Sequence, residues 1–222
     1  MSKREEILSI EILQSIRKAV LEYNVQGAKN WATKAIDEGM DPVQVADTLT
    51  DAIRKVGEDF SRGEIFIPDL VMAAEVMQNT MPTIEEEIRK KRQRRKSLGS
   101  VVIGTVLGDI HNIGKTLVST LLAAEGFDVT DLGVDLSAEK FVEAVKNSKP
   151  DILAMSALMT TTAPEQGKVI EALKKESLRE AAKIMVGGGA ITEEFAKTIG
   201  ADGYAATAPE GANLARRLIG IE

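Results

Sequence analysis

Residues 101–116 read VVIGTVLGDIHNIGKT, and they indicate the fold class of the second half of the chain. Val101 to Leu107 form a continuous apolar-rich run of strand length, which is typical of a strand covered on both faces of a sheet. A polar loop follows, and a helical pattern begins near residue 113. A buried strand that runs through a short loop into a helix is the opening unit of a doubly wound α/β domain.

The rest of the second half repeats this alternation of strand and helix. The further strand-like segments are 127–132, 151–156, 183–186 and 202–205, and the helical ones are 113–125, 138–147, 164–176, 191–199 and 209–219. Five strands alternating with helices predict a parallel sheet, and the flavodoxin-like order 2-1-3-4-5 is the usual arrangement for this number of strands. In that order a ligand binds at the carboxyl ends of the first and third strands.

The first half of the chain shows only helical periodicity, with apolar residues at three- and four-residue steps. Asp41 and Pro42 supply an N-cap and a first-turn proline for the third helix, and Pro68 starts the fourth. The helical stretches are 7–21, about 26–38, 42–56 and the segment that begins at Pro68. Four helices with short connections predict a helical bundle.

Residues 85–96 form a charge block between the two halves, and Ile88 is its one apolar residue. Such a run is typical of a solvated linker, although a basic run could instead bind nucleic acid. Residues 1–96 carry nearly equal numbers of basic and acidic side chains, which favours the linker. We therefore expect a helical cap domain at 1–88, a charged linker at 89–99 and a Rossmann-like α/β domain at 100–222.

The composition is that of an ordinary globular protein and narrows the choice of partners. The 222 residues are 44% hydrophobic and 28% charged, with a formal net charge of −6. A net negative charge disfavours nucleic acid and anionic membranes, so neither is expected as a partner. The sequence has no cysteine, no apolar run of membrane-spanning length and no apolar segment behind its first charged residues. We expect a cytoplasmic protein without thiolate metal sites.

The loop after the first predicted strand contains His111, the only histidine of the chain. A lone histidine is most often an inert surface residue, and that interpretation stays open at this point. The ending Gly114-Lys115-Thr116 is similar to that of a phosphate-binding loop, but five residues separate Gly108 from Gly114 where that motif needs four. A third interpretation makes His111 a metal ligand whose far ring nitrogen is held by Asp109.

A single histidine cannot enclose a metal ion by itself. Because the chain has no cysteine and no second histidine, the metal would have to arrive within a cofactor that supplies its remaining ligands. A tetrapyrrole-like ring is such a cofactor.

The loop is the first part of a three-part pattern. Asp109-x-His111-x-x-Gly114 is followed after 41 residues by Ser156-Ala157-Leu158, and after 28 more by Gly187-Gly188. This order and spacing resemble the signature of cobalamin-binding proteins that hold the cofactor base-off and His-on. The resemblance implies that His111 is the lower cobalt ligand. It also implies contacts with the cofactor from Gly114, Ser156, Leu158, Gly187 and Gly188.

From about residue 40 onward the chain is similar to cobalamin-dependent methionine synthase. In that family a serine six positions after the S-x-L serine forms a relay with the aspartate and the histidine, and Thr162 stands at that position here. The resemblance therefore implies a relay of His111, Asp109 and Thr162, and a contact of Thr160 with the cofactor. The residue after the histidine is often aspartate in relatives and is Asn112 here, a change from which we infer no loss of ligation.

The stretch from Gly57 to Pro68 resembles the helical cap that precedes the cobalamin domain in methionine synthase. The same cap occurs in the corrinoid proteins of methanol, methylamine and methoxyaromatic methyltransferase systems. By that resemblance Phe60 and Ile67 lie over the upper cobalt face and shield a bound methyl group. Taken alone, both residues would be assigned to the bundle core. The cobalamin signature in the same chain favours the shielding role.

The two resemblances together imply a corrinoid methyl carrier. Such a protein accepts a methyl group on cobalt(I) from a donor methyltransferase and delivers it to an acceptor methyltransferase, and a reductive activase restores cobalt(I) after oxidation. The chain would be a subunit of a multi-component methyltransferase and not a complete enzyme. Donors in such systems include methanol, methylamines, glycine betaine and aryl methyl ethers.

Two other functions use the same kind of cofactor domain. An adenosylcobalamin mutase subunit shares the histidine loop but needs no methyl-shielding cap. A cobalamin-dependent sensor and transcription regulator also places a helical bundle before this domain. That regulator needs a DNA-binding domain and usually a second histidine, and the sequence shows neither.

Overall fold

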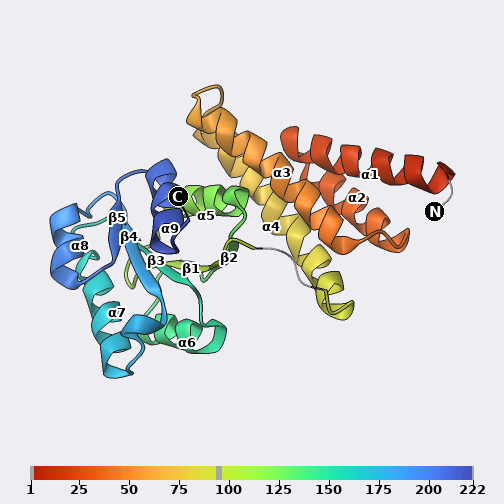
Figure 1. Ribbon diagram of the computed structural model, residues 1–222. Helices are drawn as coiled ribbons and strands as arrows, with labels where there is room; N and C mark the ends of the chain where they lie inside the picture. Colours follow the sequence, from red (N-terminus) through yellow and green to blue (C-terminus); the bar gives the residue numbers. More distant parts are fainter. Residues whose placement is uncertain (1–2, 94–96, 222) are drawn as a thin grey trace. The chain divides into compact units, whose positions relative to one another are not determined.

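The computed structural model describes residues 3–93 and 97–221, and the chain divides into two compact units, Met1–Lys96 and Ser97–Glu222. Figure 1 shows the first unit as helices alone and the second as a sheet covered by helices. Residues 94–96 of the predicted linker lie outside the described residues.

The described part of the first unit is a bundle of four helices. They are α1 (Lys3–Leu21), α2 (Val25–Asp37), α3 (Pro42–Ser61) and α4 (Ile67–Lys90). Both α1 and α4 pack against α2 and α3. The start of α3 is as predicted, because the Asp41 carboxylate accepts a hydrogen bond from the amide of Val43 (3.1 Å) and Pro42 occupies the first helical position. The predicted helical bundle is confirmed.

Helix α4 continues further than the charge pattern suggests. Its apolar stripe does not stop at Pro82, because Ile84 and Ile88 are both buried. Ile88, the one apolar residue of the charge block, is therefore a core residue that holds the last turn of the helix. The expected linker at 89–99 is wrong at its first two residues, which belong to α4.

The second unit is built on a sheet of five parallel strands. They are β1 (Ser100–Thr105), β2 (Asp128–Asp131), β3 (Ile152–Ser156), β4 (Lys183–Gly187) and β5 (Gly203–Ala205). Their order across the sheet is β2-β1-β3-β4-β5, which confirms the flavodoxin-like arrangement.

Helices cover both faces of this sheet (Figure 1). The helices are α5 (Ile113–Glu125), α6 (Ala138–Ser148), α7 (Pro164–Lys175), α8 (Glu193–Ile199) and α9 (Ala208–Leu218), with a short 3₁₀ turn at Arg179–Ala181 that the sequence pattern does not predict. Helices α6, α7 and α8 share one buried cluster with the sheet, and α5 and α9 share the other. Alternate residues of β1, β3 and β4 serve the two clusters, as the period of two in a β-strand requires.

The strand register sets up two rows of residues on the face under α5 and α9. Ile103 on β1, Ala154 on β3 and Met185 on β4 are neighbours across the sheet. Two positions nearer the carboxyl ends, Ser156 is the neighbour of Gly187. Since β1 leads to α5 on one face and β3 leads to α7 on the other, the chain leaves these adjacent strands in opposite directions. A crevice opens at such a switch point.

The start of the second unit, just before β1, lies next to the end of its last helix, α9. A Cβ atom on Gly99, the residue before β1, would lie 3.4 Å from Cδ1 of Ile219, the residue after α9.

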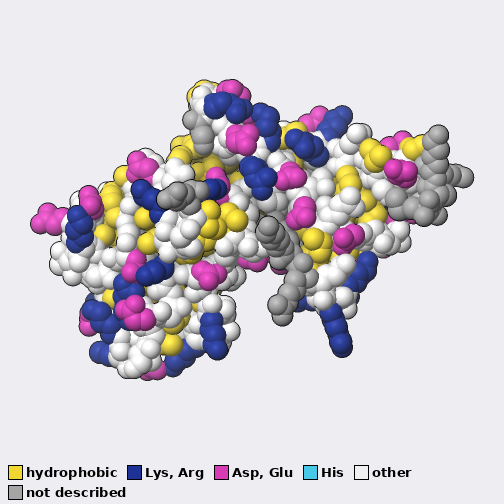
Figure 2. Space-filling model, in the orientation of Figure 1, with side chains coloured by type: hydrophobic (Ala, Val, Ile, Leu, Met, Phe, Trp, Pro, Cys, Tyr) yellow, Lys and Arg dark blue, Asp and Glu magenta, His cyan; other side chains and the backbone are white. Residues whose placement is uncertain are grey.

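The described surface shows mixed charge. On the face drawn in Figure 2, Lys and Arg side chains are interspersed with Asp and Glu side chains over both units. Within residues 3–93 and 97–221, none of the helices has the length and apolarity that crossing a membrane would demand.

Candidate functional site

The site begins where β1 ends, at the turn that leads into α5. Gly108 has a positive φ of 76°, which a glycine adopts without strain, and the Asp109 amide donates to the carbonyl of Val106 (3.1 Å). This tight turn places Asp109 inside the protein, with no exposed surface.

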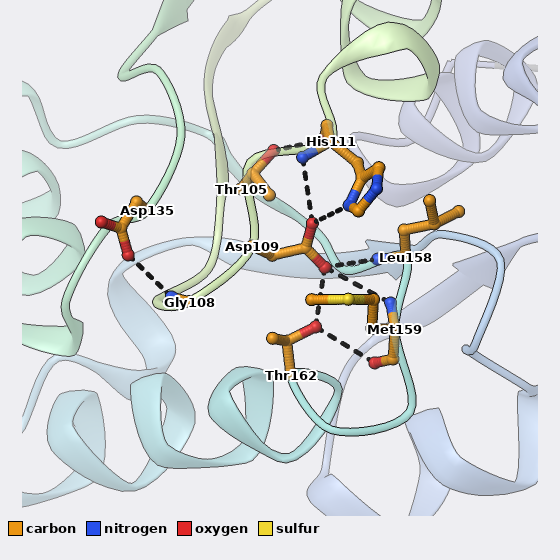
Figure 3. A network of polar contacts seen from close by, with 8 residues as sticks. All are labelled: Thr105, Gly108, Asp109, His111, Asp135, Leu158, Met159 and Thr162. Atoms are coloured by element: carbon orange, nitrogen blue, oxygen red, sulfur yellow. Dashed lines mark hydrogen bonds and ion pairs between the residues drawn. The ribbon is translucent and has the colours of Figure 1, made fainter.

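The Asp109 carboxylate accepts hydrogen bonds at both of its oxygens (Figure 3). Oδ1 accepts from the backbone amide of His111 (3.0 Å) and contacts Nδ1 of the same residue (2.8 Å). Oδ2 accepts from the amides of Leu158 (2.8 Å) and Met159 (3.3 Å) and from the hydroxyl of Thr162 (2.7 Å). One carboxylate therefore joins the loop after β1 to the loop after β3.

This network fixes the charge of Asp109. Burial acts to raise the pKa of the carboxyl group, but hydrogen bonds from the Thr162 hydroxyl, the amide and ring of His111 and the Leu158 amide outweigh it. The net result is a pKa well below the ordinary range. Asp109 is consequently an ionised carboxylate at neutral pH.

His111 has one ring nitrogen engaged and one available. An ionised carboxylate can only accept, so Nδ1 carries the proton in the contact with Asp109. The other ring nitrogen, Nε2, points away from Asp109 in Figure 3. The side chain is 46% exposed. A neutral imidazole with a lone pair on Nε2 and a carboxylate behind Nδ1 is the usual arrangement of a histidine metal ligand.

The loop after β3 distinguishes three neighbouring threonines. Thr162 is buried and donates to Asp109, whereas Thr160 and Thr161 are exposed. The sequence-based expectation for Thr160 was a contact with the cofactor, and Thr160 is not among the residues that line the cavity described next.

A cavity of about 640 Å³ opens beside His111, between the sheet and helices α5 and α9. Its lining includes five of the residues expected from the signature: Gly114, Ser156, Leu158, Gly187 and Gly188. Most of the remaining lining is apolar or small, with Ile103, Ala154 and Met185 from the sheet and Gly211 from α9.

The backbone requires the glycine pair at the end of β4. Gly188 has a φ of 119°, and a Cβ atom there would lie 2.0 Å from the carbonyl oxygen of Ala157. At Gly187 a Cβ atom would lie 3.0 Å from the carbonyl oxygen of Ala205. The turn after β4 therefore packs directly against the turn after β3, and glycine alone fits at position 188.

Sequence reasoning missed Asp135, a second carboxylate of the loop region. Its Oδ1 accepts from the Gly108 amide (2.7 Å), and its own amide donates to the carbonyl of Asp109 (3.0 Å). Asp135 therefore holds the turn that carries His111 from the side of β2 (Figure 3). Its left-handed backbone, with a φ of 55°, is a conformation that aspartate adopts more readily than most residues. No spacing in the sequence marks it.

The structure also accounts for Lys115, which follows the loop. The side chain is 3% exposed and forms an ion pair with Asp131 at the end of β2. Asp131 also accepts from the amide of Gly133 (2.9 Å). The lysine of the Gly114-Lys115-Thr116 sequence thus ties the first turn of α5 to the sheet.

The two residues expected to cover the cofactor belong to the first unit. Phe60 is half-buried near the end of α3, and Ile67 is 46% exposed at the first position of α4. Between them, Phe66 is 73% exposed. Two of the three side chains are thus not part of the bundle core.

Comparison with known proteins follows the division into two units. A family model described as "B12 binding domain" matches residues 99–213, and a second model of the same description matches residues 12–85. Trimethylamine corrinoid protein 1 of Methanosarcina acetivorans is 40% identical over 94% of this chain and 97% of its own length. The chain belongs to the B12-binding corrinoid proteins.

Solved structures agree with this assignment. The methanol:cobalamin methyltransferase complex MtaBC from Methanosarcina barkeri contains a chain that superposes with a TM-score of 0.80 and 31% sequence identity. The match covers 94% of the present chain and 80% of the chain in that complex. The monomethylamine corrinoid protein of Methanosarcina barkeri has a TM-score of 0.53 and 34% identity over 94% and 98% of the two chains.

The residues of this corrinoid protein suit a metal that brings its own macrocycle. Within residues 3–93 and 97–221, no group of three or more His, Cys, Asp and Glu side chains could hold a bare metal ion. His111 offers one available ring nitrogen, and a tetrapyrrole-like ring would supply the remaining ligands of its own metal. The cavity next to it, with a volume of about 640 Å³, offers room for a further part of the cofactor. The donor set therefore fits a corrinoid.

Proposed function

We propose that this corrinoid protein carries methyl groups between separate methyltransferases, accepting them from a donor methyltransferase and delivering them to an acceptor methyltransferase. The observation that carries the proposal is the His111 ring, held by Asp109 with Nε2 directed away, at the mouth of a 640 Å³ cavity. The near full-length similarity to trimethylamine corrinoid protein 1 supports it. When bound, the corrinoid supplies a cobalt ion that accepts a methyl group in its reduced state and releases it to an acceptor.

In this proposal His111 would hold the cobalt of the corrinoid through Nε2. The base-off, His-on mode displaces the nucleotide tail of the cofactor from cobalt, and the cavity between β1, β3, α5 and α9 offers the tail a place. Ser156 presents a hydroxyl in its lining, and Gly187 and Gly188 leave their stretch free of side chains. Gly114 and Leu158 complete the contacts that we assign to the cofactor.

Asp109 and Thr162 hold His111 in the tautomer that leaves Nε2 available to a metal. The Asp109 carboxylate holds a proton on Nδ1 of His111, so that the lone pair stays on Nε2. The Thr162 hydroxyl, at 2.7 Å, keeps Asp109 ionised.

Electron paramagnetic resonance of the cobalt(II) form tests the ligand assignment. Cobalt(II) bound to a ¹⁴N atom shows a triplet superhyperfine pattern, and protein labelled with ¹⁵N-histidine should convert the triplet to a doublet. The unlabelled nucleotide base cannot produce that change. The His111→Ala variant should lose the histidine splitting, and Asn112→Ala, its exposed neighbour, should keep it. A triplet that survives ¹⁵N labelling would show that the base, not His111, is the ligand.

Phe60 and Ile67 are proposed to shield the methyl group. Because Ile67 is nearly half exposed, its truncation should cost little core packing, while Phe60 needs a check of folding by circular dichroism. The Phe60→Ala/Ile67→Ala variant should photolyse bound methylcobalamin faster than wild type. Ile7→Ala, at an exposed apolar position of α1, serves as the matched control. Equal photolysis rates in wild type, the double variant and the control would contradict the shielding role.

The partners are proposed to be a donor methyltransferase, an acceptor methyltransferase and a reductive activase. The trimethylamine and dimethylamine names of relatives at 39% to 42% identity make methylated amines the first donors to test. The reduced protein is mixed with each donor methyltransferase and its substrate, and loss of the cobalt(I) absorbance identifies the donor. Parallel reconstitution with adenosylcobalamin tests the mutase alternative, which predicts a preference for that form.

A further inference from the structure

The inner end of the cavity is built from apolar groups alone. Ile103, Ala154 and Met185 form a row across β1, β3 and β4, and Val118 of α5 packs against the same buried cluster. Gly211 of α9 closes this end, because a Cβ atom there would lie 3.5 Å from Cγ2 of Val118 and 3.7 Å from Cε of Met185. The backbone groups of this row are already used in the hydrogen bonds of the sheet.

The polar side chains of the described lining belong to the mouth. Ser156 lies two residues nearer the carboxyl end of β3 than Ala154. Asn112 precedes α5 and Thr207 precedes α9, and both helices run from the carboxyl edge of the sheet toward its other edge. Lys115 also lines the cavity, but its ammonium group is paired with Asp131. A group that reaches the inner end therefore meets no polar side chain of the described residues.

We propose that this cavity selects cobamides whose nucleotide carries a benzimidazole-type base over those that carry a purine. The inference rests on the proposed function, because it assigns the cavity to the nucleotide tail. A benzimidazole has one ring nitrogen that is not attached to the ribose, and the Ser156 hydroxyl in the lining can donate a hydrogen bond to it. Adenine in the same position brings three unbonded ring nitrogens and an exocyclic amine. The apolar row and Gly211 offer these groups no partner.

The expected size of the preference follows from the cost of burying unpaired polar groups. A buried donor or acceptor that leaves water without a new partner costs about 1–3 kcal/mol. One such group lowers affinity by a factor of about 5 to 150. Adenine buries more than one, so we expect the adenine cobamide to bind at least about 10-fold more weakly than cobalamin.

Equilibrium binding of three corrinoids to the cofactor-free protein tests this selection. The ligands are cobalamin, which carries dimethylbenzimidazole, pseudocobalamin, which carries adenine, and cobinamide, which lacks the nucleotide. Binding is followed by the change in corrinoid absorbance. If cobalamin and cobinamide both fail to bind, the proposed function fails. If cobalamin and pseudocobalamin bind with the same Kd, the proposed function stands and the selection is overturned.

Two variants locate the selection in the inner end of the cavity. Val118→Thr adds a hydroxyl at nearly constant shape, and we expect it to narrow the ratio of the two Kd values by about 3-fold or more. Val142→Thr makes the same change on α6, in the cluster of the opposite face, and should leave the ratio unchanged. Gly211→Val fills the inner end and should weaken cobalamin without weakening cobinamide. The proposal would be overturned if Gly211→Val weakened the binding of cobalamin and cobinamide equally. It would also be overturned if the ratio of the cobalamin and pseudocobalamin Kd values were the same in the two threonine variants.

Discussion

Replacing Thr162 by valine removes one hydroxyl from the Asp109 network and keeps the shape of the side chain. Thr162 is 6% exposed, and its hydroxyl lies 2.7 Å from Oδ2 of Asp109 and 3.1 Å from the carbonyl oxygen of Met159. A hydroxyl has one proton, and the shorter contact to a charged oxygen is the stronger one. The variant therefore deprives a fully buried carboxylate of one of its donors.

The cost of Thr162→Val can be stated from that contact. A hydrogen bond to a charged group contributes about 1.5–3 kcal/mol, and the valine cannot replace it. The free energy of unfolding of the second unit should fall by about that amount. Because 1.4 kcal/mol is about tenfold in an equilibrium constant, the best-protected amides of β1 and β3 should exchange about 10 to 150 times faster.

Hydrogen exchange of the cofactor-free protein, read by mass spectrometry on peptides from β1 and β3, measures this change. Thr161→Val is the matched control, since Thr161 is exposed and adjacent. Its exchange rates should stay within about twofold of wild type, because surface substitutions change stability by less than about 0.5 kcal/mol. Unchanged exchange in Thr162→Val, or an equal acceleration in Thr161→Val, would refute the assignment of the hydroxyl to the buried carboxylate.

Substitutions at three further positions follow from the loop geometry. Asp109→Asn should lower the free energy of unfolding of the cofactor-free protein by about 3 kcal/mol in denaturant titration. Both carboxylate oxygens accept hydrogen bonds, so in either orientation the asparagine NH₂ group would face a donor where an acceptor is needed. Since the pKa of Asp109 is lowered on folding, the advantage of wild type over this variant should be complete above about pH 4 and shrink as the pH falls below it. Asp135→Ala should cost about 1–2 kcal/mol, through the lost bond to Gly108 and the left-handed backbone, whereas Asp135→Asn should cost less than half of that; equal losses would contradict the backbone argument. Gly188→Ala should cost more than about 3 kcal/mol, because its φ is positive and its Cβ would meet Ala157; a variant with a wild-type melting temperature would contradict that contact.

The sheet could be predicted from the sequence because its strands are covered on both faces. The apolar runs that become β1 and β3 stand out from the polar loops around them, and the alternation with helices fixes the order of strands. The ends were harder to place. Val106 and Leu107 continue the apolar run of β1, but Val106 forms only an isolated bridge to Leu136, and Leu107 is 44% exposed in the site loop.

The site was predictable only where its residues are close in sequence or match a known signature. Asp109 and His111 are two residues apart, so their contact is local and the pattern shows it. Thr162 lies on a distant loop, and the resemblance to methionine synthase, not the spacing, singled it out. Asp135 could not be found, because its role depends on β2 lying beside β1 and on a backbone conformation that no residue pattern records.

The closeness of Gly99 to Ile219 bears on how such a domain can be combined with others. A domain whose two ends are adjacent can be inserted into a loop of a host protein with little disturbance to either fold. The residues of the His111 site lie at the carboxyl edge of the strands, whereas Gly99 precedes the first strand at the other edge. Gene fusion or insertion at these ends would therefore leave the cofactor face accessible.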